Sequence, residues 1–318
     1  MVKWVAESRP ERREYVRANY PRSRATESWR SVVDDAEVDA VVVATHAAAH
    51  YEIARTALLA GKHVLVEKPL VTSSRDAREL EALAKRSGRV LMTGHTFLYN
   101  AVVRRMRALI DAGAIGRIHY IYTQRLNLGQ TRSDVNVWWN LAPHDVSILS
   151  YLLGDRVATS VTAQGVTFLQ EGIEDVVFAL LRFPEGVTAH VHVSWLDPGK
   201  VRRVVVVGSR KMLVYDDLAD HKLAIYDSGI DRVPSLGDRM DFDHFDSYQL
   251  LRRMGDVVLP RIEMQEPLRV EAAHFLECLS AQGECLSGPR HACDVVGMLE
   301  AGEESLRRDG EAVPPITG

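Results

Sequence analysis

The first hundred residues alternate between short apolar runs and charged segments of helical length. Runs such as VDAVVVA and KHVLV are apolar throughout, and segments such as AHYEIARTALLAG separate them. Strands of this kind, with helices between them, are typical of a parallel sheet covered on both faces. One helix is expected over 73–87, because serines precede it, Leu80 and Leu83 have core spacing, and Gly88 follows as a stop. The pattern predicts an α/β domain with βαβ connections over residues 1–98.

From residue 99 onward the pattern changes to a series of strands with short connections. Examples are VTAHVHVSWL, VRRVVVVG and KMLVYDD, with turns expected at 184–186 and 208–210. A helix is expected from about His144 to Leu153, and two helices close the chain. Short connections and partial alternation indicate a large, mostly antiparallel sheet with one face covered by helices. We therefore expect a second, α+β domain over residues 99–318.

Composition and charge narrow the class of partner. The 318 residues are 46% hydrophobic and 26% charged, with a formal net charge of −4. These values favour neither disorder nor binding to nucleic acid or an anionic membrane. The chain has no apolar run long enough to span a membrane, and its N-terminus turns charged before a signal sequence could form. A cytoplasmic protein with a small-molecule partner is expected.

The cysteines and two alternating histidines give no metal signature by spacing. Cys278, Cys285 and Cys293 lack metal-ligand spacing and paired histidines, so packing thiols are the favoured interpretation. His190 and His192 share one face of a strand, which favours an interface or solvent face. We predict no metal site.

In parallel sheets, ligands gather at the carboxyl ends of the strands, so residues just after each apolar run are candidates. Three such groups are present, at 45–50, 67–69 and 93–97. The turn Glu67-Lys68-Pro69 places an ammonium group where it could bind a substrate oxygen and stabilise developing negative charge. Taken alone, Lys68 is more often a solvated charge at a strand end.

Longer stretches around these groups resemble a known family. DAVVVATHAAAHYEIARTALLAGKHVLVEKPL, DVNVWWNLAPHDVSILSYLLG and EPLRVEAAHFLECL are similar to segments of the glucose-fructose oxidoreductase, inositol dehydrogenase and rhizopine-catabolism (Gfo/Idh/MocA) family. The resemblance implies a Rossmann domain, a following α/β domain with a mostly antiparallel sheet, and NAD or NADP as cofactor. It also implies an enzyme that oxidises a carbinol or reduces a ketone of a sugar, nucleotide sugar or cyclitol.

The resemblance further implies site residues. Lys68 would lie between the nicotinamide and the sugar, and His144 would transfer a proton. The family's aspartate is replaced here by Asn140, which can orient a substrate but cannot stabilise an imidazolium by charge. The same matches suggest cofactor-binding residues Glu7, Arg9, Thr45, His50, Glu67 and Pro69, and substrate-binding residues His95, Tyr99, Asn136 and Trp139. Each could instead serve packing, and Trp138 beside Trp139 suggests one buried ring and one pocket wall.

The expected glycine-rich turn for the pyrophosphate is not found. No glycine precedes Gly61, and VKWVAESRPERREYV resembles the family's second strand and helix. We therefore expect an incomplete, truncated Rossmann-type sheet, closed only if strand 3–6 pairs with strand 41–44. Glu7 would suit a ribose diol, whereas Ser8 and Arg9 could contact a 2′-phosphate. Without the turn, dinucleotide affinity should be weak.

Two hypotheses follow. The first is an NAD(P)-dependent oxidoreductase, and the alternative is a redox-inactive relative that has lost dinucleotide binding. Such a relative could be a sugar-binding or regulatory partner, or a redox-neutral acid-base enzyme. In either case the resemblance implies a homodimer or homotetramer, which we expect to form through residues of about 174–226.

Overall fold

The computed structural model describes residues 1–318 except 130, 235–247, 282–284 and 317–318. The chain divides into two compact units, which are described separately. The first comprises Met1–Thr96, Leu268–Glu300 and Ile316–Gly318, and the second comprises Phe97–Pro267 and Ala301–Pro315. The assignment of residues 1–98 to cofactor binding and of 99–318 to substrate binding and oligomerisation stays a prediction.

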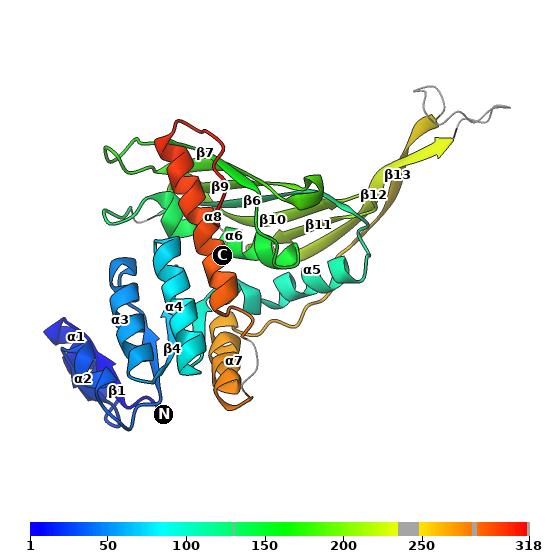
Figure 1. Cartoon of the computed structure of the whole chain (residues 1–318). Helices are drawn as coiled ribbons and strands as arrows, with labels where there is room; N and C mark the ends of the chain where they lie inside the picture. Colours follow the sequence, from blue (N-terminus) through cyan, green and yellow to red (C-terminus); the bar gives the residue numbers. More distant parts are fainter. Residues whose placement is uncertain (130, 235–247, 282–284, 317–318) are drawn as a thin grey trace. The chain divides into compact units, whose positions relative to one another are not determined.

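The first unit contains two small parallel sheets with helices between their strands (Figure 1). One sheet has the order β1-β2 and the other β3-β4-β5. The strands are β1 (Trp4–Ala6), β2 (Arg24–Thr26), β3 (Ala40–Val43), β4 (His63–Glu67) and β5 (Leu91–Gly94). The helices are α1 (Pro10–Asn19), α2 (Trp29–Val33), α3 (Ala47–Leu59), α4 (Ser74–Ser87), α7 (Pro267–Ala281) and the first part of α8 (Pro289–Arg307).

Local signals account for α4, whose predicted bounds are confirmed within one residue. The Ser73 hydroxyl oxygen accepts a hydrogen bond from the backbone amide of Asp76, which satisfies one free donor at the helix start. Gly88 ends the helix in the left-handed conformation, with φ of 62°. Leu80 is fully buried and Leu83 nearly so. Capping and apolar spacing thus fix both the length and the orientation of this helix.

The pairing that would have closed the first sheet does not form. Trp4–Ala6 pairs in parallel with Arg24–Thr26 and not with Ala40–Val43. Within the described residues, β3 therefore has a ladder partner on one side only, which is β4. Val42 of β3 is 62% exposed although Val43 is buried. One face and one edge of β3 thus lack the cover that parallel strands usually have.

A cluster around Asp35 links β1 to the segment that leads into β3. The Lys3 ammonium lies 2.8 Å from one carboxylate oxygen of Asp35, and the Trp4 indole N–H donates to the same oxygen at 2.7 Å. The Lys62 ammonium donates to the Asp35 backbone oxygen at 2.8 Å. These contacts hold the amino-terminal ends of β1 and β3 in one unit without a ladder between them.

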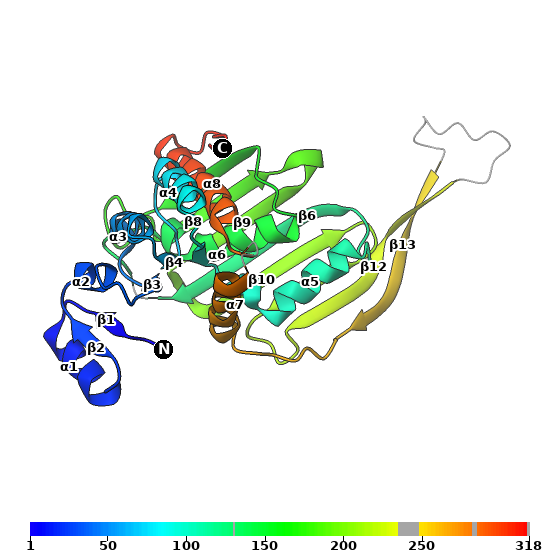
Figure 2. The same ribbon diagram turned by 60° about the horizontal axis from the view of Figure 1, so that its bottom comes forward.

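The second unit is built on one sheet of eight strands, mostly antiparallel, with the order β13-β12-β11-β10-β6-β9-β8-β7. Only β6 and β9 pair in parallel. Helices α5 and α6 pack on one face of this sheet (Figure 2). The predicted fold class, a small parallel Rossmann-type sheet followed by an α+β domain, is confirmed. The elements are η1 (Thr96–Tyr99), α5 (Ala101–Asp111), β6 (Ile118–Leu128), α6 (Val137–Leu152), β7 (Ser160–Val166), β8 (Val176–Arg182), η2 (Pro184–Gly186), β9 (Thr188–Ser194), β10 (Leu196–Gly208), β11 (Met212–Asp216), β12 (Leu223–Pro234) and β13 (Tyr248–Val258).

The start of α6 corrects the sequence prediction. The helix begins at Val137, seven residues before the predicted start at His144. Asn136 caps it, since its side-chain oxygen accepts from the Trp139 amide at 3.1 Å. Pro143 lies inside the helix, where proline signals a break in the sequence pattern. Because of this early start, Asn140, His144 and Asp145 all lie on one helix.

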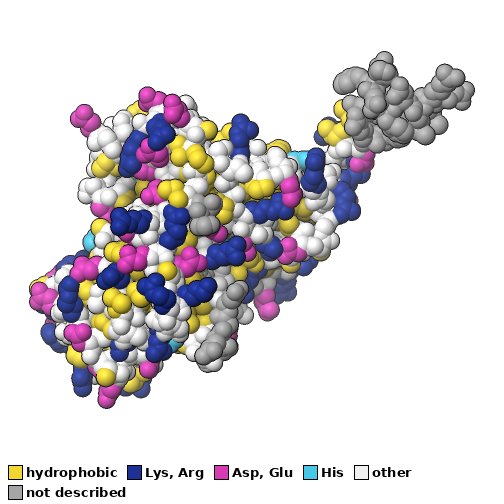
Figure 3. All heavy atoms as spheres, viewed as in Figure 1, with side chains coloured by type: hydrophobic (Ala, Val, Ile, Leu, Met, Phe, Trp, Pro, Cys, Tyr) yellow, Lys and Arg dark blue, Asp and Glu magenta, His cyan; other side chains and the backbone are white. Residues whose placement is uncertain are grey.

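Two surface properties complete the description. No helix among the described residues is long and apolar enough to cross a membrane. On the face shown in Figure 3, acidic and basic side chains lie intermixed, as expected from the small net charge of the chain.

Candidate functional site

The turn after β4 is held against the end of β5. A Cβ atom at Gly94 would lie 3.2 Å from a carboxylate oxygen of Glu67, so β5 leaves room for the Glu67 side chain because it ends in glycine. The Lys68 backbone amide donates to Glu67 Oε2 at 3.3 Å. Glu67 therefore supports its own turn, and Lys68 follows at the carboxyl edge of the sheet with a half-buried side chain.

His50 joins the ends of β3 and β4. Its Nδ1 atom lies 2.8 Å from the Pro69 backbone oxygen, and its Nε2 atom lies 3.2 Å from that of Thr45. The ring is buried within the unit, with 1% exposure, whereas the Thr45 side chain is exposed. The structure thus gives His50 a positioning role beside Lys68, and Thr45 lies at the open end of the strand.

His95 is a buried polar group whose ring has no hydrogen-bond partner among the described residues. Both ring nitrogens are buried and unbonded, as is the hydroxyl oxygen of Thr93, which is fully buried two residues earlier. The ring packs edge-on against His291, with 5.4 Å between centroids. Burial lowers the pKa of His95 well below its usual value, and the nearby His291 and Lys68 lower it further. Buried polar groups in native proteins normally have partners, so this corner suits a polar ligand.

Glu7 and Arg9 form a turn at the start of α1. One carboxylate oxygen of Glu7 accepts from the Arg9 amide at 3.0 Å, and the Arg9 guanidinium donates to the same oxygen at 3.3 Å. These contacts lower the pKa of Glu7, chiefly through the backbone hydrogen bond. The acid predicted to bind ribose is thus ionised and held at the carboxyl end of β1.

In the second unit, α6 presents the predicted proton-transfer residue. His144 packs edge-on against Phe97, with 5.1 Å between ring centroids. One turn earlier, the side-chain oxygen of Asn140 accepts from the Trp195 indole N–H at 3.1 Å. Asn140 is therefore tied to β9 and β10 through the residue that joins them.

The remaining predicted substrate residues of this unit are integrated into its packing. Beyond capping α6, Asn136 donates through its side-chain nitrogen to Glu174 at 2.8 Å and Glu303 at 3.0 Å. Trp138 is fully buried and Trp139 is 7% exposed, and the expected division into one buried ring and one pocket wall stays a prediction. Tyr99 is also buried, with the Arg104 guanidinium over its ring. Their placement supports α6 and η1, and their role in binding stays a prediction.

A buried ion pair beside His144 was not found by sequence reasoning. Arg125 and Asp145 lie 2.7 Å apart, with side chains 6% and 0% exposed, and the guanidinium also lies 4.5 Å above the Phe97 ring. Burial raises the pKa of Asp145, and the Arg125 guanidinium opposes that rise. Because Phe97 contacts both His144 and Arg125, the pair fixes the ring against which the histidine rests. Alternation on β6 could have shown that Arg125 faces inward.

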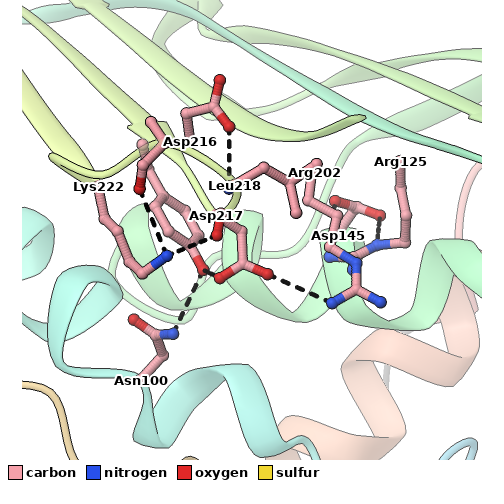
Figure 4. A network of polar contacts seen from close by, with 10 residues as sticks. Asn100, Arg125, Asp145, Arg202, Asp216, Asp217, Leu218 and Lys222 are labelled. Atoms are coloured by element: carbon pink, nitrogen blue, oxygen red, sulfur yellow. Dashed lines mark hydrogen bonds and ion pairs between the residues drawn. The ribbon is translucent and has the colours of Figure 1, made fainter. Parts of the chain in front are cut away.

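The pair lies beside a larger polar network under the sheet (Figure 4). The Tyr215 hydroxyl donates to Asp217 at 2.9 Å and accepts from the Asn100 amide at 3.3 Å. Arg202 donates to the other carboxylate oxygen of Asp217 at 3.3 Å. Burial raises the pKa of Tyr215, and Asp217 adds to this effect. The network links the start of α5 to β10 and β11.

A hollow in the second unit contains none of the predicted site residues. It has a volume of about 360 Å³ and lies between α5, the end of α6 and the turn before β9. Four of its charged side chains form two ion pairs, Arg107 with Asp111 and Arg156 with Glu185. The strand-end residues of the first unit are therefore a better candidate for the functional site than this hollow.

The first unit has polar groups that fit the two ends of a nicotinamide cofactor but no turn that fits its phosphates. His95 and Thr93 supply unsatisfied buried polar atoms beside Lys68, and Glu7 supplies an ionised carboxylate at the end of β1. Between β1 and β3 the described residues provide no glycine-rich turn for the phosphates. The residues present thus suit the two ends of a dinucleotide.

Comparison with known proteins gives matches over both units. Residues 2–95 match the family model GFO_IDH_MocA, described as "Oxidoreductase family, NAD-binding Rossmann fold", and residues 103–214 match the GFO/IDH/MocA C-terminal domain. The 1,5-anhydro-D-fructose reductase of Ensifer adhaerens is 36% identical over 53% of this chain and 54% of its own. The chain thus spans about half the length of that relative.

Two further proteins match over most of the chain. The uncharacterized oxidoreductase YdgJ of Escherichia coli strain K12 is 27% identical over 92% of this chain and 86% of its own. A crystal structure of GenD2 from gentamicin A biosynthesis, in complex with NAD, has a TM-score of 0.81 and 25% identity, over 100% of this chain and 89% of that one.

Proposed function

We propose a function from one premise: the chain belongs to the Gfo/Idh/MocA oxidoreductase family. The function is that of an NAD(P)-dependent oxidoreductase that interconverts a carbinol and a ketone of a sugar, nucleotide sugar or cyclitol. The match of residues 2–95 to an NAD-binding domain supports the cofactor class. The name of the relative from Ensifer adhaerens supports a sugar-like substrate.

The observation that carries the proposal is the group formed by Lys68, His95 and Thr93. An ammonium at the end of β4 lies near a neutral, buried imidazole whose nitrogens lack partners among the described residues. A ligand oxygen would accept from the ammonium, and a second polar group would satisfy the histidine. Such a set favours an oxygen that gains negative charge in the transition state.

When bound, the nicotinamide exchanges a hydride with a carbon of the substrate. Lys68 would hold the oxygen of that carbon and stabilise its developing charge during the transfer. His50 would keep the Lys68 turn in place through the Pro69 carbonyl. His95 would orient the ligand, and its neutral state would avoid repulsion with Lys68.

The roles of His144 and Asn140 rest on the family resemblance. We propose that His144 takes the hydroxyl proton when a carbinol is oxidised and returns it when a ketone is reduced. Asn140 would orient neighbouring groups through its amide, and its contact with Trp195 fixes that amide. Because an amide carries no charge, it would not stabilise an imidazolium as an aspartate would.

At the other end of the cofactor, Glu7 would accept hydrogen bonds from the ribose hydroxyls. Its ionised state supports this role. The neighbouring Arg9 guanidinium would suit a 2′-phosphate instead, so NADP is the second cofactor to test. The redox-inactive alternative has less support, because the N-terminal unit matches an NAD-binding domain over nearly its whole first segment.

We also propose that the chain forms a homo-oligomer through the open face of its large sheet. Phe178 stacks on His192 with 4.2 Å between ring centroids, and His190 lies 6.3 Å away on the same face. Phe178 is 44% exposed, and both histidines are half-buried. A second copy would cover these rings. Light scattering at micromolar concentration should give wild type a mass above that of a monomer and Phe178→Asp a lower mass. A wild-type chain with the mass of a monomer would contradict the proposal.

The function is tested by a turnover assay with NAD and NADP and a panel of pyranoses, nucleotide sugars and cyclitols. Lys68→Met should lower kcat/KM about 100-fold or more on any substrate that wild type turns over. Lys85→Met is the matched control, because Lys85 is exposed in the last turn of α4. If Lys68→Met keeps the wild-type rate within about twofold, the role of Lys68 is refuted.

A further inference from the structure

Helix α7 and the segment that follows it bring two thiols and an imidazole together. His274 and Cys278 are four residues apart on α7 and so lie on one face of the helix. The Sγ atom of Cys278 is 3.5 Å from Nε2 of His274. Cys285 joins them from the segment before α8, and the three ligand atoms lie within 4.8 Å of one another.

The burial of the cluster suits a closed site. Cys278 is 4% exposed, Cys285 is half-buried, and the His274 side chain is 24% exposed. All three cysteines of the chain are free thiols. A soft donor set of two thiols and an imidazole, drawn from one helix face and the following turn, is the kind that binds zinc.

We propose that His274, Cys278 and Cys285 bind one Zn²⁺ ion, with water as the fourth ligand. Zinc bonds of about 2.3 Å to sulfur and about 2.0 Å to nitrogen in a tetrahedron require ligand atoms about 3.5–3.8 Å apart. The measured distance between Cys278 and His274 already has this value. Cys285 is not part of a helix, so its thiol would make the remaining movement needed for tetrahedral coordination.

The second nitrogen of the imidazole faces a carboxylate. Glu277 Oε2 lies 3.7 Å from His274 Nδ1, one helical turn away. A carboxylate that accepts from the free N–H of a metal-bound histidine fixes the tautomer and raises its basicity. Glu277 is placed to do so, while Nε2 points to the thiols.

Zinc binding must displace one hydrogen bond and two protons. The Leu286 amide now donates to Nε2 of His274 at 3.1 Å, and the metal would take that lone pair. Burial raises the pKa of Cys285, and the neighbouring Cys278 raises it further. Both thiols lose a proton when they bind Zn²⁺, so the affinity should increase with pH.

The site would join α7 to the end of β5. The Gly288 amide donates to the Cys285 carbonyl at 2.9 Å and closes a tight turn. Within that turn, Ser287 accepts from the Thr93 amide at 2.9 Å, two residues before His95. A bound ion would therefore fix the segment that borders the end of β5.

The third cysteine provides a matched control. Cys293 lies on α8, and its thiol interacts with Glu81. It is absent from the cluster of three ligand atoms. A Cys293→Ser variant therefore removes one thiol without touching the proposed site.

The test is a Co²⁺ titration of the reduced, chelator-treated full-length chain, with the thiolate-to-Co²⁺ charge-transfer absorption as readout and Zn²⁺ as competitor. We expect one equivalent to bind with the intensity of two thiolates and to be displaced by Zn²⁺. Cys278→Ser and Cys285→Ser should each weaken binding about tenfold or more, and Cys293→Ser should not. A Co²⁺ affinity in Cys278→Ser equal to that of wild type overturns the proposal.

A second measurement uses the wild-type chain alone, so it does not depend on whether the variants fold. Zn²⁺ should protect Cys278 and Cys285 from alkylation by iodoacetamide, as read by mass spectrometry, and leave Cys293 as reactive as before. Equal alkylation with and without Zn²⁺, or a disulfide between Cys278 and Cys285 that forms in its presence, overturns the proposal.

Discussion

The Nδ1 atom of His50 lies 2.8 Å from the backbone oxygen of Pro69, and so α3 is joined to the turn that presents Lys68. The contact is buried and spans two strand ends of the parallel sheet. A residue that sequence analysis assigns to the cofactor path thus also fixes the position of the proposed catalytic lysine.

His50→Leu should destabilise the chain and loosen the turn. It leaves the Pro69 oxygen without its partner, at a cost of about 1–3 kcal/mol in the free energy of unfolding. Urea denaturation measures this cost. His46→Ala, at the exposed N-cap of the same helix, should change the free energy by less than about 0.5 kcal/mol. Equal effects of the two substitutions would contradict the positioning role.

The buried His95 predicts a pH dependence of stability. Its folded pKa lies well below the usual value because of burial, so the unfolded chain takes up a proton near pH 6.5 that the folded chain does not. The free energy of unfolding should therefore fall as the pH drops below about 6.5, by up to about 1.4 kcal/mol per pH unit from this group.

His95→Leu isolates this contribution from those of other histidines. The stability difference between wild type and variant should shift in favour of the variant as the pH falls from about 7.5 to about 5.5. Urea denaturation at several pH values measures it. If the free energies of unfolding of wild type and His95→Leu change in parallel over this pH range, His95 is protonated in the folded state as easily as in the unfolded one. That result would refute the prediction.

The ion pair of Arg125 and Asp145 predicts a large and repairable loss of stability. Arg125→Met leaves a buried carboxylate unpaired and should cost about 3–5 kcal/mol in the free energy of unfolding. Adding Asp145→Leu should restore most of it, because the unpaired charge is then removed. Arg132→Met, which breaks an exposed pair with Asp134, should cost less than about 1 kcal/mol. A double variant no more stable than Arg125→Met would refute the explanation.

Local signals made much of the fold predictable from sequence. Ser73 and Gly88 define α4, and the apolar run that ends at Glu67 defines β4. By contrast, β2 was not predicted, because Arg24–Thr26 is three residues long and partly polar. Its pairing with β1, of Trp4 with Arg24, joins two segments separated by α1, and no periodicity reveals it.

Site residues at strand ends could be predicted from the sequence. Site residues brought together by packing between distant segments could not. Lys68 and His95 follow apolar strands, which made them candidates, and the family resemblance gave them their expected roles. His291, which packs on His95, lies 196 positions further along the chain and has no local signal. The spacing of His274 and Cys278 was visible in the sequence, but without Cys285 beside them it did not stand out from helix packing.

The proposed function depends most directly on whether the purified full-length chain binds a nicotinamide cofactor. The decisive measurement is a fluorescence titration with NADH and NADPH up to millimolar concentration. We expect a saturable change in nicotinamide fluorescence, with weaker binding in Glu7→Ala if NADH is preferred, or in Arg9→Ala if NADPH is preferred. A flat titration with both cofactors would contradict it.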